Sequence, residues 1–162
     1  NLFFDNAWNS LVEMDSYGHD VEAGWLLCEA ARVLEDRQLM DRANRLALDV
    51  TDACLAEGLS DKGYMMYEKK GGRTTGHASW WGQIETMIAC VNAWQISGND
   101  VYLQSADTVW TFVKDCMIDR EYGEWYSDCF DGEPKKDTPK VSMWRCPYHT
   151  VRLGVEIHNR LK

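Results

Sequence analysis

Apolar residues recur along the chain at the three-to-four-residue spacing of α-helices, and this spacing predicts five helices. Four of them cover residues 19–35, 39–57, 80–96 and 101–117, and the fifth begins near Pro147, a residue favoured in a first helical turn. The first, third and fifth are apolar on most sides, as helices buried among neighbours are, whereas the second and fourth carry one apolar stripe. The chain therefore alternates buried and amphipathic helices.

This alternation is an internal repeat, and its register relates the beginnings of the three buried helices. Glu22 and Glu85 stand at equivalent places in the first and third helices. The same register makes His19, Gly82 and His149 equivalent to one another. We therefore expect the starts of the three buried helices to lie at one level of the fold.

Two connecting segments, residues 61–68 and 119–126, also resemble each other. Each follows an amphipathic helix, contains a glycine turn and carries aromatic residues suited to a short strand. Inner and outer layers of helices with strand-bearing loops at one rim describe an α/α toroid. We therefore expect an all-α fold, a partial (α/α)6 barrel with short β-hairpin loops, in which residues 1–162 form a single domain.

The composition narrows the class of partner and the compartment. The chain has 162 residues, is 45% hydrophobic and has a net charge of −9, which argues against nucleic acid or an anionic membrane as a partner. No window approaches the roughly 20 apolar residues of a membrane span, and no basic segment of a secretory signal is visible at the start. Six scattered cysteines, four of them inside predicted helices, indicate buried, reduced thiols in a cytoplasmic protein.

The candidate chemistry lies at the helix starts. His19 and His149 each open a predicted helix, and Trp80, Trp81 and Glu85 stand at a third helix start between them. An imidazole with a pKa of about 6.5 acts as base or acid near neutral pH, so one histidine on each face of a carbon supports two-base proton transfer. Two imidazoles with tryptophans and carboxylates at one rim indicate sugar chemistry, and no Cys/His group has the spacing of a zinc site, so we expect no metal or cofactor.

Three blocks of sequence carry a resemblance to a known family: YGHDVEA at residues 17–23, WWGQIE at 80–85 and CPYH at 146–149. Together they resemble the N-acylglucosamine 2-epimerase superfamily, most closely its cellobiose 2-epimerase branch, in order along essentially the whole chain. The resemblance implies a barrel of six helical hairpins with its active site at the loop rim. It also implies inversion at C2 of a reducing sugar, or aldose–ketose isomerisation.

The resemblance further implies roles for individual residues. His19 and His149 match the two general acid/base histidines of the family, which act on opposite sides of the substrate carbon. Glu22 matches a carboxylate that supports the first histidine and the substrate, and Trp144 matches a ring that stacks on the sugar. The implied partner is a reducing mono- or disaccharide, converted through an enediolate.

The other residues at this rim have two interpretations each. Glu85 either complements the helix dipole or contacts the substrate. Trp80 and Trp81 are either core rings, as large aromatic residues usually are, or provide a platform for a sugar. Arg152 on the fifth helix is a candidate donor to the developing oxyanion. The two remaining histidines are expected to be structural.

The number of helices limits what the chain can do alone. A closed barrel of six hairpins needs twelve helices, so the five predicted here match only the C-terminal part of a family member. We expect little or no epimerase activity from the isolated chain, because an open arc admits water to the site. The inner residues expected to be partly uncovered are Trp25, Leu26, Ile84, Trp94 and Val155. Association with itself or with a complementary N-terminal segment covers such a surface.

Two other functions stay open. An (α/α)-barrel glycoside hydrolase needs two carboxyl groups beside the scissile bond, for which Asp20 and Glu85 are available, but the paired histidines are then unexplained. The chain is alternatively a catalytically inactive carbohydrate-binding fragment or an assembly subunit. Product analysis separates the two enzyme classes, because an epimerase yields an epimer or ketose and a hydrolase yields a free leaving sugar.

Overall fold

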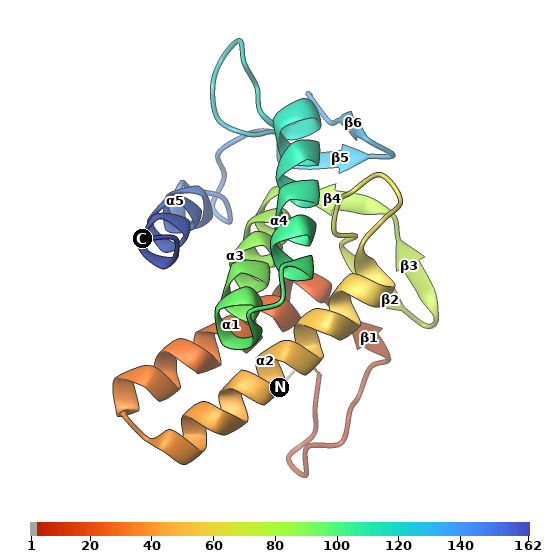
Figure 1. Cartoon of the computed structure of the whole chain (residues 1–162). Helices are drawn as coiled ribbons and strands as arrows, with labels where there is room; N and C mark the ends of the chain where they lie inside the picture. The colour runs from red at the N-terminus through yellow and green to blue at the C-terminus, as the bar shows by residue number, and fades with distance from the viewer. Residues whose placement is uncertain (1–2) are drawn as a thin grey trace.

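The computed structural model describes residues 3–162 and contains the five predicted helices (Figure 1). They are α1 Tyr17–Leu34, α2 Arg37–Gly58, α3 Trp80–Ser97, α4 Val101–Phe112 and α5 Tyr148–Arg160. A π-helical turn, Val113–Met117, extends α4 to the end that the sequence predicts. α2 begins earlier than predicted, because the Asp36 carboxylate accepts hydrogen bonds from the backbone N–H groups of Gln38 and Leu39 and so caps the helix.

Short strands within residues 3–162 form two antiparallel sheets, ordered β1-β2-β3 and β4-β5-β6. The strands are β1 Met14–Asp15, β2 Glu68–Lys70, β3 Arg73–Thr75, β4 His77–Ser79, β5 Asp128–Phe130 and β6 Glu133–Pro134. The strand character expected within residues 61–68 and 119–126 is limited to one antiparallel bridge each, Leu59–Met65 and Ile118–Trp125, and the regular strands β2 and β5 begin at Glu68 and Asp128. Gly63 and Gly123 have φ angles of 85° and 76°, a left-handed conformation that suits a turn.

α3 lies at the centre of the helices and packs against α1, α2, α4 and α5. Every residue from 82 to 93 is buried, which explains why this segment is apolar on most sides. α1 with α2, and α3 with α4, form two helical hairpins, and α5 packs on α3 (Figure 1). The inner row is thus α1, α3 and α5, and the outer row is α2 and α4.

The two sides of the inner row are more open than its centre. The prediction that the fifth helix is buried is wrong, because it packs along α3 and none of its residues is buried. Leu26 on α1 and Val155 on α5 are exposed, as expected for an open arc. Trp25 and Ile84 are buried, contrary to that expectation, and Trp94 is half-buried. The centre of the arc therefore has a complete core, whereas its edges do not.

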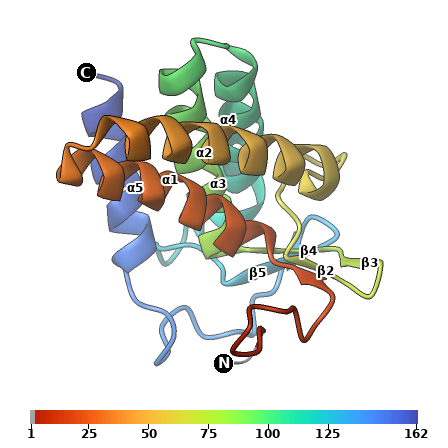
Figure 2. The same ribbon diagram turned by 90° about the horizontal axis from the view of Figure 1, so that it is seen from below.

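One end of the helices carries the loops and the sheets. Figure 2 shows the strands and the starts of α1 and α5 on the same, lower side of the molecule. Gly18 is required there, because a Cβ atom at this position would lie 2.6 Å from the Trp81 ring. The absence of a side chain lets Trp81 of α3 lie directly on the first turn of α1.

Two further expectations concern the membrane and the thiols. Among residues 3–162, no helix combines the length and the apolar character that a membrane span needs. The six cysteines are free; Cys28, Cys54, Cys90 and Cys129 are buried as predicted, whereas Cys116 is half-buried. The expectation of burial is wrong for Cys146, which is exposed in the loop just before α5.

Candidate active site

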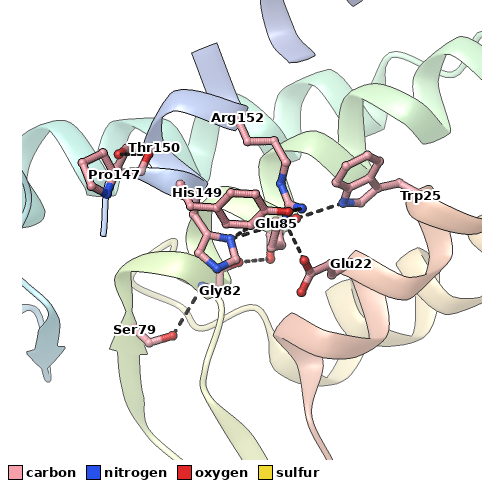
Figure 3. A network of polar contacts seen from close by, with 11 residues as sticks. Glu22, Trp25, Ser79, Gly82, Glu85, Pro147, His149, Thr150 and Arg152 are labelled. Atoms are coloured by element: carbon pink, nitrogen blue, oxygen red, sulfur yellow. Dashed lines mark hydrogen bonds and ion pairs between the residues drawn. The ribbon is translucent and has the colours of Figure 1, made fainter. Parts of the chain in front are cut away.

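A polar cluster joins the three inner helices near the loop rim (Figure 3). Glu22 comes from α1, Glu85 from α3, and His149 and Arg152 from α5. His149 Nδ1 lies 2.7 Å from Glu85 Oε1. Arg152 Nη2 donates to Glu22 Oε1 at 2.5 Å and to Glu85 Oε1 at 2.6 Å. One guanidinium therefore fixes three helices and two carboxylates relative to one another.

Glu85 is the buried anion of this cluster, with no exposed surface. Its second oxygen, Oε2, accepts a hydrogen bond from the Trp25 indole N–H at 3.0 Å. Burial raises the pKa of Glu85, but the hydrogen bonds from His149, Arg152 and Trp25 and the charge of Arg152 outweigh it, so the pKa lies below its ordinary value. Glu85 is therefore ionised at neutral pH although it is buried.

The neighbours of His149 Nδ1 indicate which ring nitrogen carries the proton when His149 is neutral. The Glu85 carboxylate lies at 2.7 Å and the Arg152 Nη2 donor at 3.3 Å, and the two require opposite states of the same nitrogen. The carboxylate is closer and negatively charged, so we assign the proton of the neutral ring to Nδ1. Nε2 is then the atom that can accept a proton from a substrate.

His19 has a different partner and shares one neighbour with His149. Its Nδ1 lies 2.7 Å from the Ser16 hydroxyl oxygen. The His19 ring is 4.6 Å from the Trp81 ring, and the His149 ring is 6.0 Å from the same Trp81 ring. The two imidazoles are thus no further apart than the sum of these distances. His19 and His149 therefore lie on the same side of the fold, next to Trp81.

The carboxylate that the resemblance pairs with His19 has another partner here. Glu22 Oε1 is bonded to Arg152, and Ser16 bonds His19 instead. The sequence offers a signal for Ser16, since a serine three residues before the histidine is also the residue that precedes α1. Tyr148 was not singled out either, although its hydroxyl is bonded to Arg152 and its ring lies 4.5 Å from that guanidinium.

The two remaining tryptophans of the predicted site differ in placement. The Trp80 ring lies edge-on to His149 at 6.2 Å and faces the Arg145 guanidinium at 4.8 Å. Trp144 is 85% exposed, and no ring contact or ion pair within residues 3–162 joins it to the cluster. Its place beside a bound sugar stays a prediction.

Three groups of the cluster have the arrangement of possible metal ligands. Glu22, Glu85 and His149 each offer one ligand atom within 4.8 Å of the others. The Arg152 guanidinium lies among them and already supplies a positive charge to both carboxylates. A metal ion would have to displace this guanidinium. The charge of Arg152 therefore disfavours metal binding by these three groups.

Comparisons with known proteins place these residues in a family. The profile of the N-acylglucosamine 2-epimerase (GlcNAc 2-epimerase) family matches residues 2–152. A cellobiose 2-epimerase of Bacteroides fragilis is 41% identical over 161 residues, which cover 96% of this chain and 40% of that protein.

The chain also superposes on solved structures of epimerases. A sugar epimerase from a ruminal bacterium superposes with a TM-score of 0.93 at 36% identity, over 98% of this chain and 41% of that chain. Cellobiose 2-epimerase from Bacillus thermoamylovorans B4167 superposes with a TM-score of 0.87 at 34% identity, over 98% of this chain and 40% of that chain.

The chain spans about 40% of the length of the curated relatives that it matches. The predicted fold class is confirmed, because the helices alternate between inner and outer rows and superpose on part of the (α/α)6 barrels of epimerases. The profile match extends over most of the chain, and the relatives cover nearly all of it. This chain belongs to the N-acylglucosamine 2-epimerase family.

Proposed function

We propose that this chain carries the proton-transfer residues of a sugar 2-epimerase that inverts C2 of a reducing mono- or disaccharide. The observation that carries the proposal is the pair of imidazoles beside Trp81, each with a hydrogen bond at Nδ1 and none at Nε2 within residues 3–162. The relatives named cellobiose 2-epimerase support a reducing disaccharide as the substrate class.

The proposed reaction needs no oxidant or reductant. The Nε2 atom of one neutral histidine takes the proton from C2, and the electron pair of the broken C–H bond forms the C1–C2 double bond of an enediolate. The second histidine, protonated at the start, returns a proton to the opposite face of C2, and the C1 carbonyl forms again. The two rings exchange protonation states in each turnover, and each such group contributes about 10²–10⁴-fold to the rate.

Glu85 acts on His149 in this proposal. Its carboxylate fixes the Nδ1–H tautomer, so Nε2 faces the substrate as a base, and it offsets the positive charge of the ring once that base has taken a proton. A direct contact between Glu85 and a sugar is disfavoured, because the carboxylate has no exposed surface and both oxygens are bonded. The same burial weighs against Glu85 as a hydrolase acid.

Arg152 holds the carboxylates in this proposal. Nη1 is bonded to the Tyr148 hydroxyl and Nη2 to the Glu22 and Glu85 carboxylates, so these two nitrogens already hold three neighbouring side chains in place. We assign Arg152 a positioning role. Glu22 keeps 20% of its side chain exposed and is suited to accept a hydrogen bond from a sugar hydroxyl.

Proton transfer next to a carbonyl requires no metal or cofactor. We expect epimerisation to persist after exhaustive treatment with a chelator, since Arg152 supplies the local positive charge. Loss of activity to the chelator and its return with one divalent ion would show that Glu22, Glu85 and His149 bind a metal instead.

A cytoplasmic location of the protein also stays a prediction.

The test uses this chain alone and this chain joined behind the preceding portion of the Bacteroides fragilis relative. We propose that residues 1–162 form the C-terminal part of one barrel domain, with exposed Leu26 and Val155 at its two open edges. The joined protein is expected to convert cellobiose to its C2 epimer. The chain alone is expected to show little or no activity and to sediment as a species heavier than 18.7 kDa.

Two results would contradict this account. A well-folded monomer of the chain that epimerises cellobiose at an ordinary rate of about 1–10³ per second would show that the open arc suffices. A joined protein that folds, binds cellobiose and leaves it unchanged would favour a carbohydrate-binding role, and release of glucose would favour a hydrolase.

A further inference from the structure

We propose that Trp25 is a positioning residue, which orients Glu85 through its indole N–H and thereby sets the direction of the His149 base. This inference rests on the proposed function, since it assigns His149 to proton transfer. Trp25 lies on α1, is 2% exposed and donates from Nε1 to Glu85 Oε2 at 3.0 Å (Figure 3). The sequence pattern alone gives it only as an apolar residue of an inner helix.

The division of hydrogen bonds between the two oxygens of Glu85 supports this role. Oε1 receives both His149 and Arg152, whereas the bond from Trp25 is the one that Oε2 receives within residues 3–162. A carboxylate bonded at one oxygen can still rotate about its last side-chain bond. The bond at Oε2 opposes that rotation, so Oε1 stays aimed at His149 Nδ1.

The surroundings of Glu85 make this bond difficult to replace. The apolar core that contains Trp25 also contains Tyr17, Val21, Ile84 and Ile88, all of them buried. Without the indole N–H, Oε2 would be a buried acceptor on a charged group without a donor, a state that costs more than the hydrogen bond itself contributes. The carboxylate would then turn, and its bond to His149 would weaken.

The indole ring itself contacts two cations of α5. The Arg152 guanidinium lies 5.1 Å from the ring centroid, and the Arg160 guanidinium lies 5.8 Å from it. Arg160 is 5% exposed and is anchored by Glu29 and Asn92. Trp25 therefore couples the far end of α5 to Glu85, and its fixed ring gives the N–H a defined direction.

The test measures Glu85 and His149 directly in the whole chain by NMR, with ¹³C at the Glu carboxyl carbons and ¹⁵N in the imidazoles. In Trp25→Phe, the Glu85 carboxyl is expected to titrate at a higher pH than in the unmodified chain, because one donor to the anion is gone. The His149 Nδ1–H signal is expected to lose its protection from solvent exchange, while the His19 and His158 signals are unchanged.

Trp94→Phe is the matched control, because it also removes an indole N–H bond to a carboxylate, that of Asp100, at the end of α3 away from the rim. It is expected to leave Glu85 and His149 unchanged. In the protein joined to its N-terminal portion, Trp25→Phe is expected to lower kcat by about tenfold with little change in KM.

Replacement of Trp25 by benzothienylalanine, in which sulfur replaces the indole N–H at nearly constant shape, covers the case in which Trp25→Phe does not fold. If the folded variant leaves the Glu85 titration and the His149 Nδ1–H signal as they are, Trp25 has only a packing role and the proposal is overturned. If the NMR signals change but the unmodified joined protein is inactive, the positioning of Glu85 by Trp25 stands and the epimerase function fails.

Discussion

His19 and His149 occupy equivalent places at the starts of α1 and α5, yet their surroundings differ in charge and burial. His19 is exposed, and its Nδ1 partner is the neutral hydroxyl of Ser16, three residues earlier in the chain. His149 is half-buried, and its partner is the ionised carboxylate of Glu85, which is itself fixed by Arg152. The repeat thus sets where a histidine lies, and the residues around it set its chemical character.

The difference gives the two proposed bases different constraints. A hydroxyl both donates and accepts, so Ser16 can bond either tautomer of His19 by rotation of its O–H. An ionised carboxylate only accepts, so Glu85 restricts the neutral His149 ring to the Nδ1–H tautomer. We therefore expect His149 to depend strongly on its partner and His19 to depend weakly on its own.

Removal of either imidazole is expected to have the largest effect. In the protein joined to its N-terminal portion, His149→Asn and His19→Asn should each lower kcat for epimerisation by about 10²–10⁴-fold, because one face of the carbon loses its acid/base group. His158→Asn on α5 is the control and should retain full activity. A variant of His19 that keeps wild-type kcat would leave a single base at this site.

Glu85→Gln is expected to have the next largest effect, a loss in kcat of about 10²-fold, because the amide cannot enforce the Nδ1–H tautomer. Steady-state kinetics on cellobiose measure it. Glu57→Gln is matched in charge and also loses an ion pair, with Lys69, but it lies at the end of the outer helix α2. Equal losses in the two variants would indicate a general effect of charge rather than a partner of His149.

The stability of the chain should depend on acid through Glu85. Because its folded-state pKa is lowered, its contribution is fully present above the ordinary glutamate pKa and is lost as the pH falls through the folded value. Urea unfolding from pH 7 to pH 3 should therefore show a steeper loss of stability for the unmodified chain than for Glu85→Gln. Parallel curves would show that Glu85 carries no such linkage.

The unmodified chain must be compared with the Glu85→Gln variant because other carboxylates titrate in the same pH range. The hydrogen bond from Lys140 lowers the pKa of Asp119 to about 2, so Asp119 also contributes to the acid dependence. Both chains contain this pair, and the difference between their curves isolates Glu85.

The smallest expected effect belongs to Ser16→Ala, a loss in kcat of less than about tenfold, since water can replace an exposed hydroxyl. Ser79→Ala is the matched control, because Ser79 is the equivalent residue before α3 and its hydroxyl accepts from the Gly82 N–H rather than from a histidine. A loss for Ser16→Ala as large as that for Glu85→Gln would remove the asymmetry between the two histidines.

The helices could be predicted from the sequence because their burial depends on local periodicity. The regular strands could have been predicted from their turns, since Gly71-Gly72 and Asp131-Gly132 have left-handed φ angles and join β2 to β3 and β5 to β6. The segments 61–68 and 119–126 instead contribute one bridging residue each, Met65 and Trp125.

The polar pairings of the site could be predicted only in part, for a physical reason. The Ser16–His19 bond joins residues three positions apart at a helix start, where side chains one turn apart are neighbours. Glu85 and His149 are 64 positions apart, and Trp25 and Glu85 are 60 apart. Such contacts depend on how α1, α3 and α5 pack, which periodicity does not specify.

The most direct test of the two-base account follows the exchange of the C2 proton in D2O. In the joined protein, His19→Asn should exchange the C2 proton of one epimer and leave that of the other, and His149→Asn should show the opposite preference. Each variant keeps one base, and that base reaches one face of the carbon. The claim that His19 and His149 serve opposite faces is contradicted if either variant exchanges the C2 proton of both epimers. It is also contradicted if both variants exchange the C2 proton of the same epimer.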